Sequence, residues 1–215
     1  MNRHRRQVLF GMAGLLTAAS SPLAGTLLAT PRQTAGPFYP ESLPLDDDND
    51  LTHVTGQSGQ ANGVISDLTG RILDINGRPL QDIRIEIWQC DAHGRYRHPL
   101  ENGRNKPDQN FQGHGHSVTD VRGRYRFRTI RPVKYPGRTP HIHVAVFAPG
   151  ETPFVTQLYV KGDPLNTQDF LFNRVPVERR HLVVSDFKPA QQPGVELKAG
   201  FDIILDRIVG TPQQS

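Results

Sequence analysis

The chain has 215 residues, with 25 basic and 21 acidic side chains, nine histidines, one cysteine and a formal net charge of +4. This length fits one domain of ordinary size with an additional segment. Three of the basic residues and none of the acidic ones fall in residues 1–29, so the remainder carries a charge of about +1. A charge this small gives no basis for binding a polyanion, and we expect no nucleic-acid partner.

Residues 1–29 have the layout of an export signal. Arg5 and Arg6 precede an apolar run over 8–19 that is too short to span a bilayer stably. The arginine pair resembles a twin-arginine signal, which exports proteins already folded around a cofactor; an ordinary secretory signal is the alternative. We expect a periplasmic or extracellular protein with no stable membrane span after signal removal. Cys90 stands alone, so no internal disulfide is expected.

Residues 30–62 are rich in proline, glycine, aspartate, glutamine and serine, and they have no sustained apolar period. This composition predicts an extended N-terminal arm ahead of one domain over 63–215. The acidic run 46–50 lacks the glycine and the closing glutamate of a calcium-binding loop, so we interpret it as a solvated turn.

From residue 63 onward, short segments with alternating apolar and polar residues are separated by turn residues. Ile83, Ile85 and Ile87 share one face of such a segment. The expected strands cover 64–73, 83–89, 124–130, 142–147, 154–160, 181–185 and 201–205. Regular short strands with almost no helical periodicity predict an all-β sandwich.

Two long connections interrupt the expected strands. Residues 99–116 directly follow Tyr96, and loops of this length in compact domains usually carry function, so we expect this one to wall an active site. His114 and His116 have glycine and serine neighbours and are interpreted as loop histidines. Residues 163–175 are expected to contain a short helical turn.

The segment from Tyr135 to His143 carries a phenol, a guanidinium and two imidazoles within nine residues. Side chains alternate along a strand, so His141 and His143 point the same way. Imidazoles combined with phenolate oxygens suit hard ferric iron better than thiolates do, and Tyr96 supplies a second phenol upstream. Taken alone, the histidines also fit an exposed strand, and the tyrosines also fit core aromatic residues.

Several short motifs resemble the intradiol ring-cleavage dioxygenases, above all the protocatechuate 3,4-dioxygenase type. They are Ile87-Trp88-Gln89, Gly94-Arg95-Tyr96-Arg97-His98, Phe111-Gln112-Gly113, Gly123-Arg124-Tyr125-Arg126-Phe127 and Tyr135-Pro136 with His141-Ile142-His143. The resemblance extends, with gaps, from Thr34 to Leu205. It implies a transthyretin-like (prealbumin-like) β-sandwich with an extended N-terminal arm and long active-site loops.

The resemblance also implies a non-haem Fe(III) enzyme with one iron per active site. Such an enzyme inserts O2 into a catechol-type aromatic diol and releases a ring-opened dicarboxylate of the cis,cis-muconate type. By resemblance, Tyr135 and His143 are the axial iron ligands, and Tyr96 and His141 are the equatorial ones. Tyr135 is the ligand that leaves when the diol binds.

Five further residues take roles from the same resemblance. Arg138 matches an active-site arginine, whose charge is expected to stabilise carbanion character in the bound ring. Gln157 matches a glutamine that supports the site, and Trp88 matches a tryptophan in the site wall. Phe38 or Tyr39 of the arm is expected to cap the pocket.

The chain departs from the two-subunit enzymes of the family next to the predicted ligands. Gly137 stands where those enzymes have a bulky tryptophan, and the stretch between Tyr135 and His141 is shorter, which predicts a more open pocket. A partner subunit helps those enzymes to bind the substrate carboxylate; for this chain a homo-oligomer and an unidentified partner subunit both stay open. Protocatechuate, catechol, hydroxyquinol and larger aromatic diols all remain candidate substrates.

Two other functions fit parts of the sequence. A cupin also uses an H-x-H pair, but it usually places a glutamate three or four residues later, where this chain has Val146 and Phe147. A non-enzymatic prealbumin-like binding module of the cell envelope fits the strand pattern, because a fold alone does not give function. Such a module has no need of two tyrosines and two histidines, so their retention favours the enzyme.

Overall fold

The structure is a computed structural model that describes residues 26–43, 46–101 and 106–207. The predicted signal over residues 1–29 therefore lies almost wholly outside the described residues. Within the described part, no helix has the length and apolar character needed to cross a membrane. The expectation of a mostly β protein is confirmed, since ten strands and three short helical segments make up the described elements.

The first sheet is built around the longest strand, β1 (Ile65–Asp74). The antiparallel strand β4 (Arg124–Ile130) pairs with β1 along most of its length and places Phe127 opposite Leu68. Strands β9 (Leu197–Gly200) and β10 (Ile203–Leu205) run parallel to β1 and pair with its first and last parts. The two-residue strand β8 (Lys188–Pro189) continues the sheet from β9.

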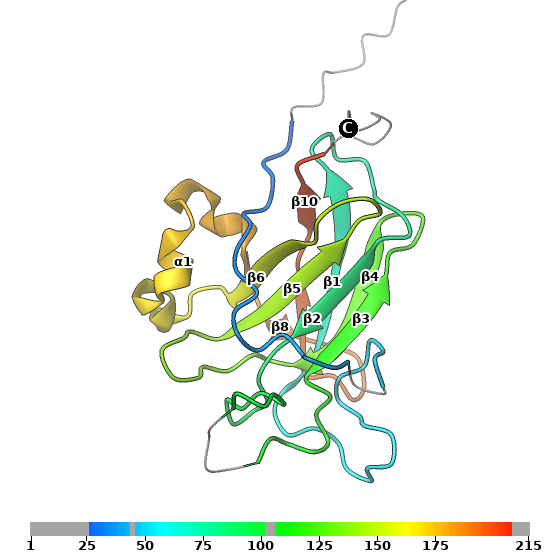
Figure 1. The fold of residues 1–215 in the computed structure, drawn as a ribbon, viewed down its shortest axis with the longest axis vertical. Helices are drawn as coiled ribbons and strands as arrows, with labels where there is room; N and C mark the ends of the chain where they lie inside the picture. Colours follow the sequence, from blue (N-terminus) through cyan, green and yellow to red (C-terminus); the bar gives the residue numbers. More distant parts are fainter. Residues whose placement is uncertain (1–25, 44–45, 102–105, 208–215) are drawn as a thin grey trace, which may run out of the picture.

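The second sheet has five strands in the order β3, β2, β5, β6 and β7. Their bounds are His114–Val118, Arg84–Trp88, His141–Phe147, Phe154–Val160 and Val184–Ser185. All neighbours are antiparallel except β6 and β7, which are parallel. Figure 1 shows β3, β2, β5 and β6 side by side in front of β1, β4 and β10.

One apolar cluster joins the two sheets. It contains Leu68, Ile72 and Phe127 from the first sheet and Ile85, Ile87, Ile142, Val144 and Leu158 from the second. Side chains alternate between the faces of a strand, so burying Ile142 and Val144 in this core turns His141 and His143 to the other face of the second sheet. The core thereby decides on which side of the sheet the histidines lie.

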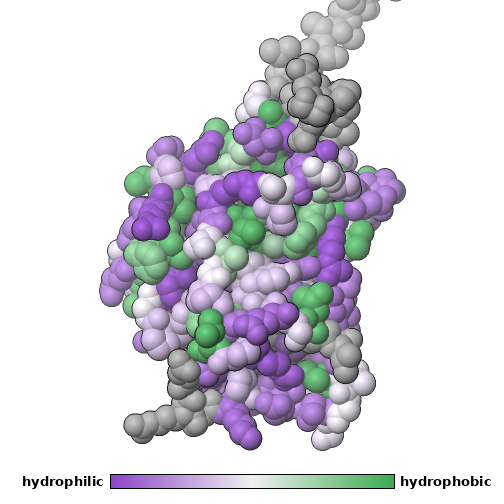
Figure 2. All heavy atoms as spheres, in the orientation of Figure 1, coloured by the Kyte–Doolittle hydropathy of each residue, from purple (hydrophilic) through white to green (hydrophobic). Residues whose placement is uncertain are grey.

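The first described part of the predicted arm, together with the residues just before it (26–43), runs across that outer face (Figure 1), whereas Leu51 and Ala61 of the predicted arm belong to the apolar cluster between the sheets. The backbone of this first part is fixed at Gln33, whose N–H donates to the carbonyl of Val155 on β6, and at Thr30, whose N–H donates to the carbonyl of Ile204. Figure 2 shows this side of the molecule as mostly hydrophilic, with hydrophobic residues in small separate groups. The arm thus covers part of the second sheet that would otherwise face water.

Three short helical segments lie between β6 and β7. They are the 3₁₀ turn η1 (Pro164–Gln168), the α-helix α1 (Phe170–Arg174) and the 3₁₀ turn η2 (Val177–Leu182). The helical turn expected within residues 163–175 is confirmed. The strand expected over 181–185 is confined to Val184–Ser185, because its first residues belong to η2.

The interpretation of His114 and His116 as loop histidines is wrong. Both lie on β3, where Trp88 pairs with His114 and Glu86 pairs with His116, and His114 is only 2% exposed. Glycine at position 115 is required by close packing, since a Cβ there would lie 2.3 Å from the carbonyl oxygen of Asp48. Glycine and serine have low strand propensity, so pairing with β2 overrides the local sequence preference.

The interpretation of residues 46–50 as a solvated turn is wrong at Asp47. Its Oδ2 accepts a hydrogen bond from Arg84 at 2.9 Å, and its Oδ1 lies 3.3 Å from His114 Nδ1 and 3.1 Å from His116 Nδ1. These partners come from β2 and β3, so only the tertiary fold brings them to the acidic run.

We predict that Gly70→Ala destabilises the fold by about 2 kcal/mol or more, because the new methyl must displace packed backbone. A Cβ at Gly70 would lie 1.9 Å from the carbonyl oxygen of Phe201 and 2.7 Å from the hydroxyl of Tyr125. Gly200→Ala is the matched control, since a Cβ there meets no atom within 4 Å. Urea unfolding of both variants measures the difference; equal midpoints would contradict the packing argument.

Candidate active site

Four rings gather at the start of β5. The Nε2 atoms of His141 and His143 lie 3.2 Å apart. The ring centroid of Tyr135, in the loop before β5, is 5.4 Å from that of His141. Tyr96, from the connection between β2 and β3, lies 5.4 Å from the Tyr135 ring and 6.2 Å from the His143 ring. The fold therefore brings the four predicted ligands together from three segments of the chain.

Both histidines are held neutral. Burial, reinforced by the nearby charge of Arg138, lowers the pKa of His141 to about 3, and burial also lowers the pKa of His143 well below its usual range. His141 Nδ1 lies 2.7 Å from the carbonyl oxygen of Thr139, which can only accept, so Nδ1 carries the proton. The lone pair of His141 is thus on Nε2, the atom that faces His143, as in a metal-binding imidazole.

The two phenols differ in exposure. Tyr96 is 3% exposed, and its oxygen has no hydrogen-bond partner of good geometry among the described residues, although Tyr135 lies beside it. Burial raises the pKa of Tyr96 well above its usual value, and burial also raises the pKa of the half-buried Tyr135. A buried polar atom without a partner lowers the stability of the fold by about 1–3 kcal/mol, so a ligand that binds the phenol oxygen of Tyr96 would remove this cost.

Arg138 is held from two sides beside these rings. Its Nε donates to Asp169 Oδ2 at 2.8 Å, and its Nη2 donates to the side-chain carbonyl of Gln157. Its Nη1 lies 3.4 Å from the hydroxyl of Tyr135. The side chain of Arg138 is only 7% exposed, so its positive charge is fixed next to Tyr135 with little screening by water.

Asp169 ties helix α1 to the loop that leads into β5. Its Oδ1 accepts from the backbone N–H groups of Leu171 and Phe172, and its Oδ2 accepts from Arg138 and from the N–H of Thr139. Sequence reasoning missed this residue. An aspartate at the start of a helical turn is a recognisable N-cap signal, but nothing local indicates a partner 31 residues away.

The arm reaches the same network through Gln157. The amide nitrogen of Gln157 donates to the carbonyl of Thr34 at 2.9 Å. The hydroxyl of Tyr159 lies 3.1 Å from the Gln157 oxygen that Arg138 binds, and 2.6 Å from Oε1 of Gln33. Sequence reasoning missed Gln33 and Tyr159 as well, because a glutamine in an arm of irregular structure carries no signal of its partners.

Aromatic side chains cover the rings of the site. Trp88 stacks on His143 with 4.9 Å between centroids, and Phe38 of the arm stacks on Tyr96 at 4.4 Å. Tyr39 meets Trp88 edge-on at 5.0 Å and donates a hydrogen bond to Glu86. The tryptophan and both arm residues thus lie near the site, where the resemblance expects them.

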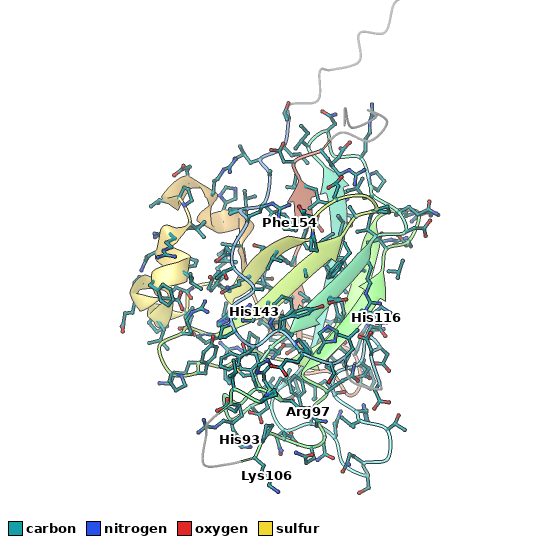
Figure 3. The ribbon with its side chains drawn as sticks, viewed as in Figure 1. His93, Arg97, Lys106, His116, His143 and Phe154 are labelled. Carbon is teal, nitrogen blue, oxygen red and sulfur yellow. The ribbon has the colours of Figure 1, made fainter. Side chains whose placement is uncertain are left out.

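A cavity of about 400 Å³ borders the site on the side of Phe38, Trp88 and Tyr96. Gln112 and Gly113 of the long loop line it, so this loop does border the site. Figure 3 shows His143 near the middle of the molecule and His116 on β3. Trp88 of β2 pairs with His114 on one side and with His143 on the other, so β2 lies between the two H-x-H pairs.

Cys90 belongs to the same apolar cluster as Tyr96 and Trp88. Burial raises the pKa of its thiol to about 12, and its Sγ donates to the carbonyl of Val133. The thiol therefore stays protonated, and the donors that remain for a cation are imidazole nitrogens and phenol oxygens.

Comparisons with known proteins identify the family of this arrangement. A family model described as "Dioxygenase" matches residues 34–207. The beta chain of protocatechuate 3,4-dioxygenase from Burkholderia cepacia is 38% identical over 178 residues, which cover 78% of this chain and 75% of the relative. The chain belongs to the intradiol ring-cleavage dioxygenases. The family expected from the sequence motifs is confirmed.

Other members of the family are more distant or longer. Catechol 1,2-dioxygenase from Acinetobacter baylyi is 33% identical over 214 residues, and the match covers 84% of this chain but only 63% of that enzyme. The solved dioxygenase domain of a dioxygenase and carbohydrate-binding fusion from Streptomyces sp. SirexAA-E has a TM-score of 0.62 and 31% identity, covering 83% of this chain and 98% of that domain.

We predict that Asp169→Asn lowers the stability of the fold by about 1–3 kcal/mol at neutral pH, because a helix cap and a buried ion pair weaken together. Its hydrogen bonds hold the pKa of Asp169 below the ordinary 3.8, although burial opposes them. A carboxylate with a lowered folded pKa stabilises the fold above its unfolded pKa and loses this contribution as the pH falls through the folded pKa.

The difference in the free energy of unfolding between wild type and Asp169→Asn should therefore be largest at pH 7 and should decrease as the pH falls below 3.8. Urea unfolding as a function of pH measures it. A difference that is independent of pH would show that the carboxylate charge contributes nothing.

Proposed function

We propose that this intradiol dioxygenase binds one non-haem Fe(III) through Tyr96, Tyr135, His141 and His143, and that it inserts O2 into a catechol-type diol. The product is a ring-opened dicarboxylate of the cis,cis-muconate type. The observation that carries the proposal is the meeting of two neutral imidazole nitrogens 3.2 Å apart with the buried phenol of Tyr96 and the half-buried phenol of Tyr135. We further propose that the two sheets form the transthyretin-like sandwich that the resemblance implies.

The residues present fit ferric iron. The buried oxygen of Tyr96 has no partner of good geometry among the described residues, and the neutral Nε2 atoms of His141 and His143 face each other. A trivalent cation would favour the phenolate form of both tyrosines and so reverse the effect of burial on their pKa values. Two phenolates and two imidazoles are a donor set that suits a hard metal ion.

Bound iron would supply a Lewis acid that chelates the diol and activates its ring toward O2. The residues of the chain prepare that reaction. If bound iron held Tyr135 as a phenolate, its oxygen could accept a proton from an incoming diol, and the positive charge of Arg138, 3.4 Å away, would stabilise the phenolate until then. Arg138 can then stabilise negative charge on the ring, because Asp169 and Gln157 fix its position in advance.

Aromatic packing shields two of the predicted ligands from water. Trp88 covers one face of His143 and Phe38 covers Tyr96, so both predicted ligands are shielded. A site with little water strengthens the effect of the Arg138 charge. This arrangement gives no support to the alternative of a non-enzymatic binding module, because binding alone does not require a buried arginine beside a phenol.

The substrates named for relatives are protocatechuate, catechol and hydroxyquinol. For this chain we propose the shared class, an aromatic ring with adjacent hydroxyls, together with O2. We also propose export to the periplasm or the exterior, supported by the pair Arg5-Arg6 before the apolar run. The arm lies over the site of its own chain. This position is compatible with a homo-oligomer and with an additional partner subunit.

We predict that His143→Ala lowers iron affinity by at least about 10–100-fold, because one of four ligands is lost. The phenolate-to-iron charge-transfer colour of the purified protein and its iron content measure the effect. His116→Ala is the matched control, since it changes the H-x-H pair on β3. Full iron occupancy in His143→Ala would remove this histidine from the ligand set.

Arg138→Gln should keep the iron colour and lower kcat by about 10²–10³-fold, the usual cost of losing one fixed charge-stabilising group. Ring cleavage is followed by the loss of catechol absorbance in air. Arg126→Gln, at an exposed position on β4, is the control. A kcat within twofold of wild type in Arg138→Gln would exclude the proposed role.

A further inference from the structure

A second cavity lies next to the proposed iron site. It has a volume of about 450 Å³ and is lined by residues 134–139 of the loop before β5 and by Leu165, Gln168 and Asp169 from the η1–α1 segment. Tyr135 and Arg138 belong both to this cavity and to the site. A molecule held at the site can therefore extend into the cavity.

The cavity is larger than a catechol ring requires. An apolar cavity of about 150 Å³ is enough to hold benzene, so this one has room for a further group of ring size. Gly137 contributes to the space, because a Cβ at this position would meet no atom within 4 Å. Its backbone φ of +79° is one that glycine adopts readily and most other residues avoid. Glycine at position 137 therefore leaves this part of the cavity unfilled.

The lining of the cavity is cationic, since it includes Lys134 and Arg138. Phe170 follows the lining residue Asp169 in the sequence; it is 56% exposed, and the guanidinium carbon of Arg138 lies 5.7 Å from its ring centroid. Lys134 is exposed and has no ion pair within the part of the chain that the structure describes. Asp169 is the carboxylate of the lining, and it is buried and bound to Arg138. Lys134 therefore offers a ligand in this cavity an unpaired positive charge.

We propose that this cavity is a subsite for the ring substituent of the substrate, and that the protein prefers catechols with a bulky acidic substituent over unsubstituted catechol. The inference rests on the proposed ring cleavage and names the substrate within the catechol class. The ammonium of Lys134 pairs with the carboxylate of the substituent, and Leu165 contacts its apolar part. The substituent passes unchanged through the reaction, while both oxygen atoms of O2 enter the two new carboxylates of the opened ring.

The test compares kcat/KM of the iron-loaded full-length enzyme for catechol, 3,4-dihydroxycinnamate and the methyl ester of 3,4-dihydroxycinnamate. The ester has nearly the same shape as the acid but no charge. We expect kcat/KM for the acid to exceed that for catechol by about tenfold or more. We expect kcat/KM for the ester to be about tenfold lower than that for the acid, because the ester loses one charge-assisted hydrogen bond.

Two variants separate charge from space. Lys134→Gln should lower the acid-to-catechol ratio of kcat/KM about tenfold and leave the acid equal to the ester. Gly137→Asn, in which asparagine tolerates a positive φ, should lower the ratios of both acid and ester to catechol by filling the cavity. Lys161→Gln, at an exposed lysine that lines a different cavity, should keep the wild-type ratios.

A wild-type preference for catechol, or an unchanged acid-to-catechol ratio in Lys134→Gln, would overturn the subsite while ring cleavage itself stands. An iron-loaded protein that cleaves none of the three compounds would instead overturn the proposed function. The two failures are therefore distinguishable in one set of measurements.

Discussion

The alternation of side chains along β5 is the constraint on which the rest of the molecule depends. Ile142 and Val144 are fully buried between the two sheets, and this burial turns His141 and His143 together toward the opposite face. A shift of one residue in the pairing of β5 with β2 and β6 would exchange the two sets. The register that fills the core therefore also places the imidazoles, so the stability of the sandwich and the geometry of the site are set by the same strand.

The face that receives the histidines has an unusual electrostatic composition. Two buried neutral imidazoles, a buried phenol and a buried guanidinium lie close together. Among the described residues that contact Arg138, only Asp169 supplies a compensating negative charge. In a dry environment such groups raise the free energy of the fold unless each is paired. Iron bound by the phenols and imidazoles would relieve this cost, so we expect metal binding and folding stability to be coupled.

The N-terminal arm completes the site from the same chain. Phe38 stacks on Tyr96, and Gln33 and Thr34 join the hydrogen bonds that run through Tyr159 and Gln157 to Arg138. Long-range contacts of this kind fix the arginine more firmly than its own loop can, because the loop around Gly137 is open to the neighbouring cavity. The arm thus covers rings of the site, and the loop around Gly137 faces the subsite proposed for the ring substituent.

The sequence by itself determined the family, the mostly β architecture, the strands β4 and β6 at their full length and the set of four rings, because alternation and short motifs are local properties of the chain. It was wrong about His114, His116 and Asp47, whose partners lie on β2 and β3 and override the low strand propensity of glycine and serine. Only the tertiary structure decided the parts played by Asp169, Gln33 and Tyr159, since a hydrogen bond between residues 31 or 126 positions apart leaves no local pattern. The cavity beside Gly137 was decided in the same way, because an empty volume depends on which segments the fold places around it.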